Sequence, residues 1–343
     1  MQVLLELRNL TVEFPASPRA VTAVRDVSFG VARGEVLGLV GESGSGKSVT
    51  SLAILRLLPP QARVQGEILF EMDGKPQNLL ALDPEPMRRL RGASISMIFQ
   101  EPMSALNPVF SVGDQVAEVV RIHGNGSRAD AWKRAVEMLA LTGIPDPDDR
   151  ARQYPHQLSG GMRQRVLIAM ALIMSPALVI ADEPTTALDV TIQAQILELL
   201  VDLQKRFGTS ILMITHDLGV IAETASRVVV MYCGEVVEEA DVQTLFASAH
   251  HPYTEGLMNA MPQLGEPRAR LNVIPGSVPP PTDWPSGCRF RDRCPYSWER
   301  CEREHPPLYE ISAGHTSRCH LAVEPERRAH PHPPVVEQMG VPA

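Results

Sequence analysis

The fold of this chain is decided by eight consecutive residues, Gly41-Glu42-Ser43-Gly44-Ser45-Gly46-Lys47-Ser48. They match the pattern G-x-x-x-x-G-K-[ST] at every fixed position. An apolar run typical of a buried strand, residues 36–40, comes before them, and a helical stretch that ends before Pro59 comes after them. This order of strand, glycine-rich loop and helix predicts a phosphate site, because loop N–H groups and the positive end of the helix attract phosphate oxygens.

The residues of this loop have distinct predicted roles. The glycines let the backbone N–H groups curl around phosphate oxygens. Lys47 reaches the β and γ phosphates, and Ser48 supplies an oxygen to Mg²⁺. The predicted phosphate-binding set is Gly41, Ser43, Gly44, Ser45, Gly46, Lys47 and Ser48.

Two acidic residues follow a second apolar run, residues 178–181. Asp182 ends this predicted strand and suits Mg²⁺, which it is expected to bind through a water molecule, and Glu183 can polarise a water that attacks the γ-phosphate. Two acids at a strand end are common on protein surfaces. Their combination with the phosphate loop is what predicts a hydrolytic site.

Short apolar runs and helical patterns alternate along most of the chain, which predicts an α/β fold. Ser159 can cap a helix that runs to about residue 174, and a second amphipathic helix is closed by Gly208. The expected strands are 2–14, 21–31, 36–40, 66–72, 178–181, 211–215, 228–232 and 236–237, and the expected helical regions are 101–157, 159–174 and 191–207.

Composition narrows the class of protein. The 343 residues carry a net charge of −8, which argues against a nucleic-acid partner because such proteins present a basic face. The longest uncharged apolar-rich run, residues 166–181, is broken by Ser175-Pro176 and is shorter than a membrane span. The first residues include an acid, Glu6, and lack the pattern of a signal peptide, so we expect a cytosolic protein.

The stretch Leu158-Ser159-Gly160-Gly161-Met162-Arg163-Gln164-Arg165 resembles the signature motif of ATP-binding-cassette (ABC) ATPases. The resemblance implies a P-loop NTPase core with an antiparallel β subdomain and a helical signature subdomain at about 101–174. It also implies ATP and Mg²⁺ as cofactors and a head-to-tail dimer. In such a dimer Ser159, Gly160 and Gly161 close over the ATP held by the partner's phosphate loop.

The resemblance assigns roles to four further residues. Gln100 is similar to the family glutamine that touches Mg²⁺ or water, and Asp189 to the loop that crosses the dimer seam. His216 is similar to the histidine that contacts the γ-phosphate. Phe14 occupies the place of an aromatic residue that stacks on adenine, and a core role is the alternative for it.

Several segments resemble the dipeptide and oligopeptide importer branch, which includes nickel importers; they are residues 99–108, 154–157, 185–195 and 251–254. This implies a peripheral subunit at the cytoplasmic face of the membrane that energises peptide uptake, with nickel or another small solute as the alternative. The implied partners are two transmembrane permease subunits, a second ATPase subunit (a similar chain or a copy of this one) and an extracytoplasmic substrate-binding protein.

Four of the five cysteines and 14 of the 30 prolines lie in the last 79 residues, so an accessory region begins near residue 250. Cys288, Cys294, Cys301 and Cys319 have neither zinc-finger nor common ferredoxin spacing, which leaves a metal site and a metal-free loop open. Residues 285–290 resemble the tail of peptide-importer ATPases, and this implies a [4Fe–4S] cluster on the four cysteines, with zinc as the alternative. Arg289, Arg291 and Arg293 are expected to offset its charge.

The sequence therefore predicts three regions: an ABC nucleotide-binding domain at 1–250, a peptide-importer-type extension with the cysteines at 251–321, and a disordered tail at 322–343. Two other functions compete with transport. One is a soluble cassette ATPase acting in translation or DNA repair, which usually has two cassettes or a long coiled coil. The other is a metal-sensing regulator built on the cysteines.

Overall fold

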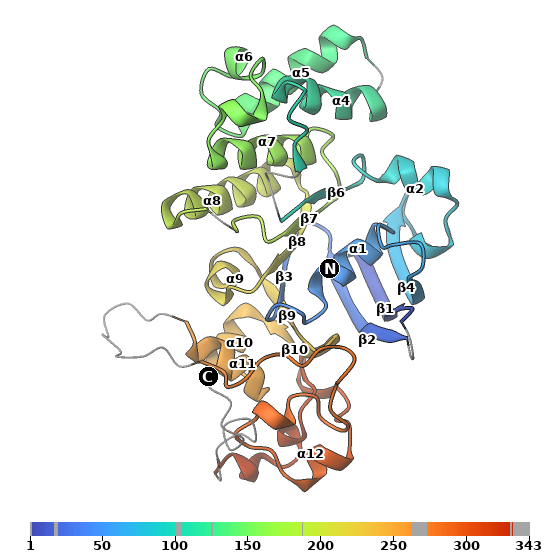
Figure 1. Ribbon diagram of the computed structural model, residues 1–343, viewed down its shortest axis with the longest axis vertical. Coiled ribbons are helices and arrows are strands. Elements are labelled where there is room, and N and C mark those ends of the chain that lie inside the picture. The colour runs from blue at the N-terminus through green and yellow to red at the C-terminus, as the bar shows by residue number, and fades with distance from the viewer. Residues whose placement is uncertain are drawn as a thin grey trace. The chain divides into compact units, whose positions relative to one another are not determined.

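The computed structural model describes residues 2–16, 20–100, 105–124, 126–186, 188–261, 273–329 and 331. They form two compact units (Figure 1). The first unit contains the chain up to Leu5, Gly30–Val36 and Leu69–Ile214, and the second contains Glu6–Phe29, Leu37–Ile68 and the chain from Thr215 onward. The units alternate along the sequence.

The first unit is built on three parallel strands, β6 (Ile95–Ile98), β7 (Leu178–Asp182) and β8 (Ser210–Thr215), with β7 paired to both others. Every residue of β7 and β8 is buried, as expected for strands covered on both faces. β5 (Lys75–Asn78) pairs antiparallel with the end of β4 (Arg63–Met72). The buried parallel strands bring Asp182 to the end of β7, where chemistry is expected.

Helices surround these strands, and their first residues explain where they begin. The Ser111 hydroxyl caps α4 and the Ser127 hydroxyl caps α5, each by accepting a backbone N–H from the first turn. α4 and α5 pack on each other and on α7, as the green elements of Figure 1 show. The helices of this unit are α2 (Pro84–Leu90), α4 (Val112–His123), α5 (Arg128–Leu141), α6 (Pro147–Arg150), α7 (Gly160–Leu172) and α8 (Val190–Phe207).

The second unit contains a sheet in the order β11-β12-β10-β9-β3. β9 (Arg227–Tyr232) runs parallel to β3 (Val36–Val40) and forms a hairpin with β10 (Glu235–Asp241), which confirms the hairpin predicted around Gly234. A bulge between Val236 and Glu238 was not predicted. β1 (Val3–Phe14) lies between β2 (Val21–Ala32) and β4 in a second sheet. The helices α1 (Lys47–Ile54), α9 (Leu218–Thr224) and α10 (Val242–Ala247) complete this part.

The C-terminal extension, residues 251–331, contains α11 (Pro252–Asn259), α12 (Glu299–Arg303), β11 (Tyr309–Ser312) and β12 (His315–Ser317). An aromatic cluster joins it to the hairpin: the Tyr232 ring lies 4.7 Å from the Tyr253 ring and 5.2 Å from the Phe290 ring, between centroids. Aromatic packing against β9 therefore helps to order this region.

Part of the predicted disordered tail has regular structure. Residues Pro325–Ala329 form a 3₁₀ helix, and Arg328 pairs with Glu255 of α11. This short segment was misjudged because its ordering contact comes from α11, more than seventy residues earlier in the chain. The rest of the predicted tail, residues 330 and 332–343, lies outside the described residues.

Candidate active site

The phosphate loop joins β3 to α1 in the second unit, and glycine is required at two of its positions. A Cβ atom on Gly41 would lie 2.2 Å from the carbonyl oxygen of Met231 and 2.7 Å from Ser45 Oγ. Gly46, the residue that precedes α1, has a φ of 103°, in the left-handed region that side chains disfavour. The loop can therefore take this path only with glycine at both ends.

Lys47 is the first residue of α1 and is 5% exposed. Its Nζ donates hydrogen bonds to the carbonyl oxygens of Gly41 at 2.6 Å and Glu42 at 3.0 Å. A positive charge held inside the loop, next to the N-terminal end of a helix, makes this an anion-binding position. Ser43, Gly44 and Ser48 are exposed, so the loop presents its tip and the first turn of α1 outward.

The predicted hydrolytic carboxylates lie in the first unit. Asp182 is 5% exposed and ends β7, as predicted. The Glu183 backbone has a φ of 47°, and its N–H donates to the Ile214 carbonyl oxygen at 2.8 Å. Oε2 of Glu183 accepts hydrogen bonds from Gln100 Nε2 and the Thr186 hydroxyl, both at 2.8 Å. The structure thus brings Gln100 and Glu183 together and adds Thr186, which the sequence reasoning missed.

The signature residues begin α7. The Ser159 hydroxyl accepts the Met162 N–H at 3.3 Å, which confirms the predicted cap. Gly160 and Gly161 form the first turn, and a Cβ atom on Gly161 would lie 2.9 Å from a methyl carbon of Ile192 in α8. The glycine therefore allows close packing of α7 on α8, in addition to any role toward a nucleotide.

Three other predicted residues are placed as follows. Asp189 caps α8 by accepting the Ile192 N–H at 3.0 Å. His216 follows β8 directly and is exposed. Phe14 is the last residue of β1 and has intermediate exposure. The roles proposed for Asp189 across a dimer seam, for His216 toward phosphate and for Phe14 toward adenine stay predictions.

Glu42, a variable position of the loop motif, is bound by two residues from far along the chain, and sequence reasoning missed it. Its N–H donates to the Tyr253 hydroxyl oxygen at 2.7 Å. Its carboxylate pairs with Arg293, which is 3% exposed, at 2.7 Å from Nη1 to Oε2. Both partners belong to the C-terminal extension. No local pattern around Glu42 could have revealed them.

The four clustered cysteines lie in the extension, and all are free thiols. Burial, and then the nearby Cys319, Cys294 and Cys301, raise the pKa of the Cys288 thiol. Across the described residues, no group of three or more His, Cys, Asp or Glu side chains is arranged to hold a metal ion.

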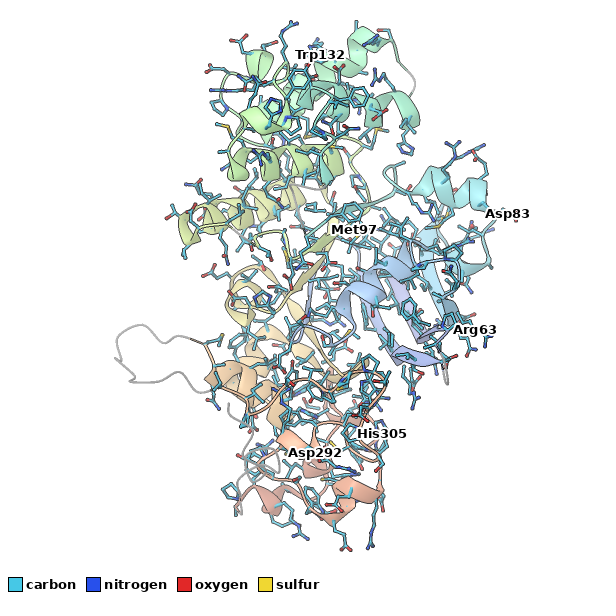
Figure 2. The ribbon with its side chains drawn as sticks, in the orientation of Figure 1. Arg63, Asp83, Met97, Trp132, Asp292 and His305 are labelled. Carbon is cyan, nitrogen blue, oxygen red and sulfur yellow. The ribbon has the colours of Figure 1, made fainter. Side chains whose placement is uncertain are left out.

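The arginines next to these cysteines, which we expected to offset the charge of a bound cluster, have partners on other residues. These partners are Glu235 for Arg289, Ser286 for Arg291 and Glu42 for Arg293. Glu235 also pairs with Nε2 of His305 at 3.1 Å, and His305 is labelled in Figure 2. Carboxylates on the hairpin and the phosphate loop bind Arg289 and Arg293, because both arginines are buried and buried charges require partners.

Comparison with known proteins identifies the family. The family described as "ABC transporter" matches residues 24–186, and the family described as "Oligopeptide/dipeptide transporter, C-terminal region" matches residues 237–301. A protein of Sinorhizobium fredii named "Probable peptide ABC transporter ATP-binding protein y4tR" is 54% identical over 320 residues, covering 92% of this chain and 94% of that protein. This chain belongs to the ABC transporter family.

Other relatives agree with this assignment of the cassette. The dipeptide transport ATP-binding protein DppD of Escherichia coli is 47% identical over 94% of this chain and 97% of DppD. The solved dimeric structure of the ATP-binding cassette MJ0796, in a post-hydrolysis state bound to ADP and Pi, is 30% identical with a TM-score of 0.61; the match covers 70% of this chain and 99% of MJ0796. The predicted α/β cassette fold is confirmed, and the chain is an ABC ATPase subunit.

Of the helices that the structure describes, none has both the length and the apolar character that crossing a membrane requires.

Proposed function

We propose that this ABC subunit hydrolyses ATP to drive the uptake of dipeptides and oligopeptides, as a peripheral subunit at the cytoplasmic face of the membrane. One observation carries the proposal: the chain joins an ABC transporter match to a match with the C-terminal region of oligopeptide and dipeptide transporters. Relatives with the same layout are named as peptide and dipeptide import ATP-binding proteins. Cassette ATPases of translation or DNA repair are disfavoured by that C-terminal match.

In the proposed chemistry, each residue of the motifs has a distinct role. Lys47 and the loop N–H groups bind the phosphates of ATP, and Ser48 and Asp182 hold Mg²⁺. Glu183 orients and polarises the water that attacks the γ-phosphate. The geometry supports this role, because hydrogen bonds from Gln100 and Thr186 fix the orientation of the Glu183 carboxylate. We assign His216 to the γ-phosphate and Phe14 to adenine on the family resemblance.

The subunit is proposed to work as a pair of cassettes. In the head-to-tail arrangement, Ser159, Gly160, Gly161 and Asp189 of one cassette would face the ATP held by the other. Ser159 and the glycines begin a 13-residue helix whose N-terminal end is a favourable place for phosphate. The solved structure of the relative MJ0796 is dimeric and contains ADP and Pi, which supports this arrangement.

A hollow on the helical part of the first unit supports the proposed permease contact. It has a volume of about 800 Å³, and it is lined by Trp132, Tyr154, Asp114, Arg121, Arg128 and Arg152 among others. Trp132 is labelled in Figure 2, and the Arg152 guanidinium lies 5.8 Å from its ring centroid. Aromatic and arginine side chains are enriched at protein interfaces. We propose that a short cytoplasmic helix of a transmembrane permease subunit docks here, and that an extracytoplasmic substrate-binding protein delivers the peptide to the complex.

We also propose that Cys288, Cys294, Cys301 and Cys319 hold a [4Fe–4S] cluster. The four cysteines form no disulfides, so each thiolate can bind a different iron. This proposal rests on the resemblance of residues 285–290 to the tail of peptide-importer ATPases, and zinc is the alternative. When bound, the cluster would cross-link the extension.

Two measurements test these proposals. The chain should be co-expressed with its permease partners, reconstituted in vesicles and tested for ATPase stimulation by dipeptides, longer peptides and nickel chelates. Stimulation by peptides supports the proposed function, whereas stimulation by nickel chelates alone would identify the chain as a subunit of a nickel importer instead. For the cysteines, iron and sulfide should be quantified after anaerobic purification. About four irons per chain supports the cluster, and zinc without iron contradicts it.

A further inference from the structure

All the polar groups of Glu42 have partners, and two of these partners come from the C-terminal extension. The carbonyl oxygen accepts from Lys47 Nζ at 3.0 Å and from the Ser45 N–H at 3.2 Å, both inside the loop. The N–H and the carboxylate are bound by Tyr253 and Arg293. Glu42 therefore joins the lysine that meets phosphate to the extension.

The Arg293 side chain is also held by backbone carbonyl oxygens of its own extension. Its Nε donates to the Pro275 carbonyl oxygen at 2.7 Å, and its Nη2 also lies 3.4 Å from the carbonyl oxygens of Ile274 and Gly276. Its two terminal nitrogens bind the two carboxylate oxygens of Glu42 at 2.7 and 3.0 Å. This bidentate pairing fixes orientation as well as distance. Tyr253 is fully buried, so its hydroxyl is held in place too.

A second connection reaches the loop through the β9–β10 hairpin. The Gly234 N–H donates to the Ser45 carbonyl oxygen at 2.9 Å. The extension holds this turn: Arg289 donates to the Cys233 carbonyl oxygen, and its guanidinium lies 3.8 Å from the centroid of the Trp284 ring. A Cβ atom on Gly234 would lie 2.7 Å from Trp284, so the ring packs directly on the turn. Two independent routes thus run from the extension to the phosphate loop.

We propose that the C-terminal extension is a positioning element for the phosphate loop, with Arg293 and Tyr253 as its positioning residues. By holding the N–H and carboxylate of Glu42, they set the loop conformation in which Lys47 and the loop N–H groups meet ATP. Loss of either contact lowers the affinity for nucleotide by letting Glu42 and its carbonyl oxygen, a partner of Lys47, move. The inference rests on the proposed role of the loop in ATP binding.

The test compares variants of the full-length chain. Arg293→Ala removes the pair, Arg293→Lys keeps the charge without the bidentate fork, and Tyr253→Phe removes one hydroxyl while keeping the buried ring. Arg328→Ala is the matched control, because Arg328 is another arginine of the extension that pairs with a glutamate, Glu255, and with the His250 carbonyl. Dissociation constants for a fluorescent ATP analogue are measured first, followed by KM and kcat for ATP in the assembled importer.

We expect Arg293→Ala to weaken nucleotide binding about tenfold or more, since charged hydrogen bonds of this kind are lost. KM for ATP rises while kcat changes much less, the pattern of lost ground-state binding. Arg293→Lys should recover part of the affinity, and Tyr253→Phe should show a smaller rise in the dissociation constant. The double variant Glu42→Ala/Arg293→Ala should bind no more weakly than Arg293→Ala, because the arginine acts through Glu42.

Three results would overturn the inference. The first is wild-type affinity in a folded Tyr253→Phe chain and in Arg293→Lys. The second is an equal loss of affinity in Arg328→Ala, which would mean that any damage to the extension has this effect. The third is full additivity in the double variant. Failure of the wild-type chain itself to bind ATP would instead refute the proposed function, so the two failures are distinguishable.

Discussion

Gln100 donates a hydrogen bond of 2.8 Å from Nε2 to Oε2 of Glu183, so the second residue after β6 holds the first residue after β7. Thr186 donates to the same oxygen at 2.8 Å. Glu183 keeps this orientation although its φ of 47° lies in the left-handed region, which costs a non-glycine residue roughly 1–3 kcal/mol. Strained backbone of this kind persists where neighbouring groups over-determine it, and such places are often functional.

Glu183→Gln should separate ATP binding from hydrolysis. The amide oxygen can still accept from Gln100, but the variant lacks a basic carboxylate, so turnover should fall by about 10²-fold or more. Affinity for ATP should stay near the wild-type value. Thr186→Val removes only one hydrogen bond to Glu183 and should lose less activity. A normal turnover rate in Glu183→Gln would show that the base is another group.

Lys47→Ala should weaken ATP binding by at least about tenfold, because it removes the charge that is held inside the phosphate loop. Calorimetric titration with MgATP measures the change. Lys133→Ala is the control, since Lys133 is an exposed lysine on α5. Equal affinities for the two variants would contradict the role assigned to Lys47.

Gly41→Ala should destabilise the chain and abolish nucleotide binding, because the new Cβ would lie 2.2 Å from a backbone carbonyl oxygen. Gly208→Ala is a matched comparison: Gly208 has a φ of 65° and open space around it, so the cost is limited to about 1–2 kcal/mol of backbone strain. Urea unfolding and nucleotide titration of both variants check this. The expectation fails if Gly41→Ala unfolds like Gly208→Ala and still binds ATP.

Stability should fall as the pH drops from 6.5 toward 4. Burial lowers the pKa of His251 to about 4, so the folded chain keeps this imidazole neutral while the unfolded chain takes up a proton below its ordinary pKa of 6.5. Because the unfolded state then binds more protons, the free energy of unfolding decreases, by at most about 3 kcal/mol from this group.

The variant His251→Asn isolates this effect. Nδ1 of His251 accepts the Tyr253 N–H at the start of α11, and asparagine can also cap a helix. Its urea unfolding curves between pH 4.5 and 6.5 should depend less on pH than those of the wild-type chain. An unchanged pH dependence would assign the loss of stability to other groups.

The parts of the structure that the sequence predicted are those with local causes. Residues 36–48 contain a strand, a loop and a helix start whose order is itself the signal, and β3 and α1 lie where that order requires. Ser159 and Gly208 act on backbone groups within a few residues of themselves, so the start of α7 and the end of α8 were also predictable. The two acids at the end of β7 could be placed there because a single apolar run, residues 178–181, precedes them.

The parts that the sequence could not predict depend on residues far apart in the chain. Glu42 stands at a variable position of the loop motif, and its partner Arg293 lies 251 residues away. The arginines near the cysteines were expected to offset the charge of a bound cluster, whereas the fold pairs Arg289 and Arg293 with glutamates on other elements. Thr186 lacks any motif role, and only the geometry at Glu183 shows its hydrogen bond.

The pairing of Glu42 with Arg293 has a consequence for the time at which the subunit matures during its synthesis. At about 5–20 residues per second, a ribosome needs roughly 13–50 s to extend the chain from one partner to the other. During that interval the nascent loop has its glycines and lysine but lacks the arginine that holds it. The growing polypeptide would therefore acquire full affinity for ATP only after Arg293 has been synthesised, long after the loop itself.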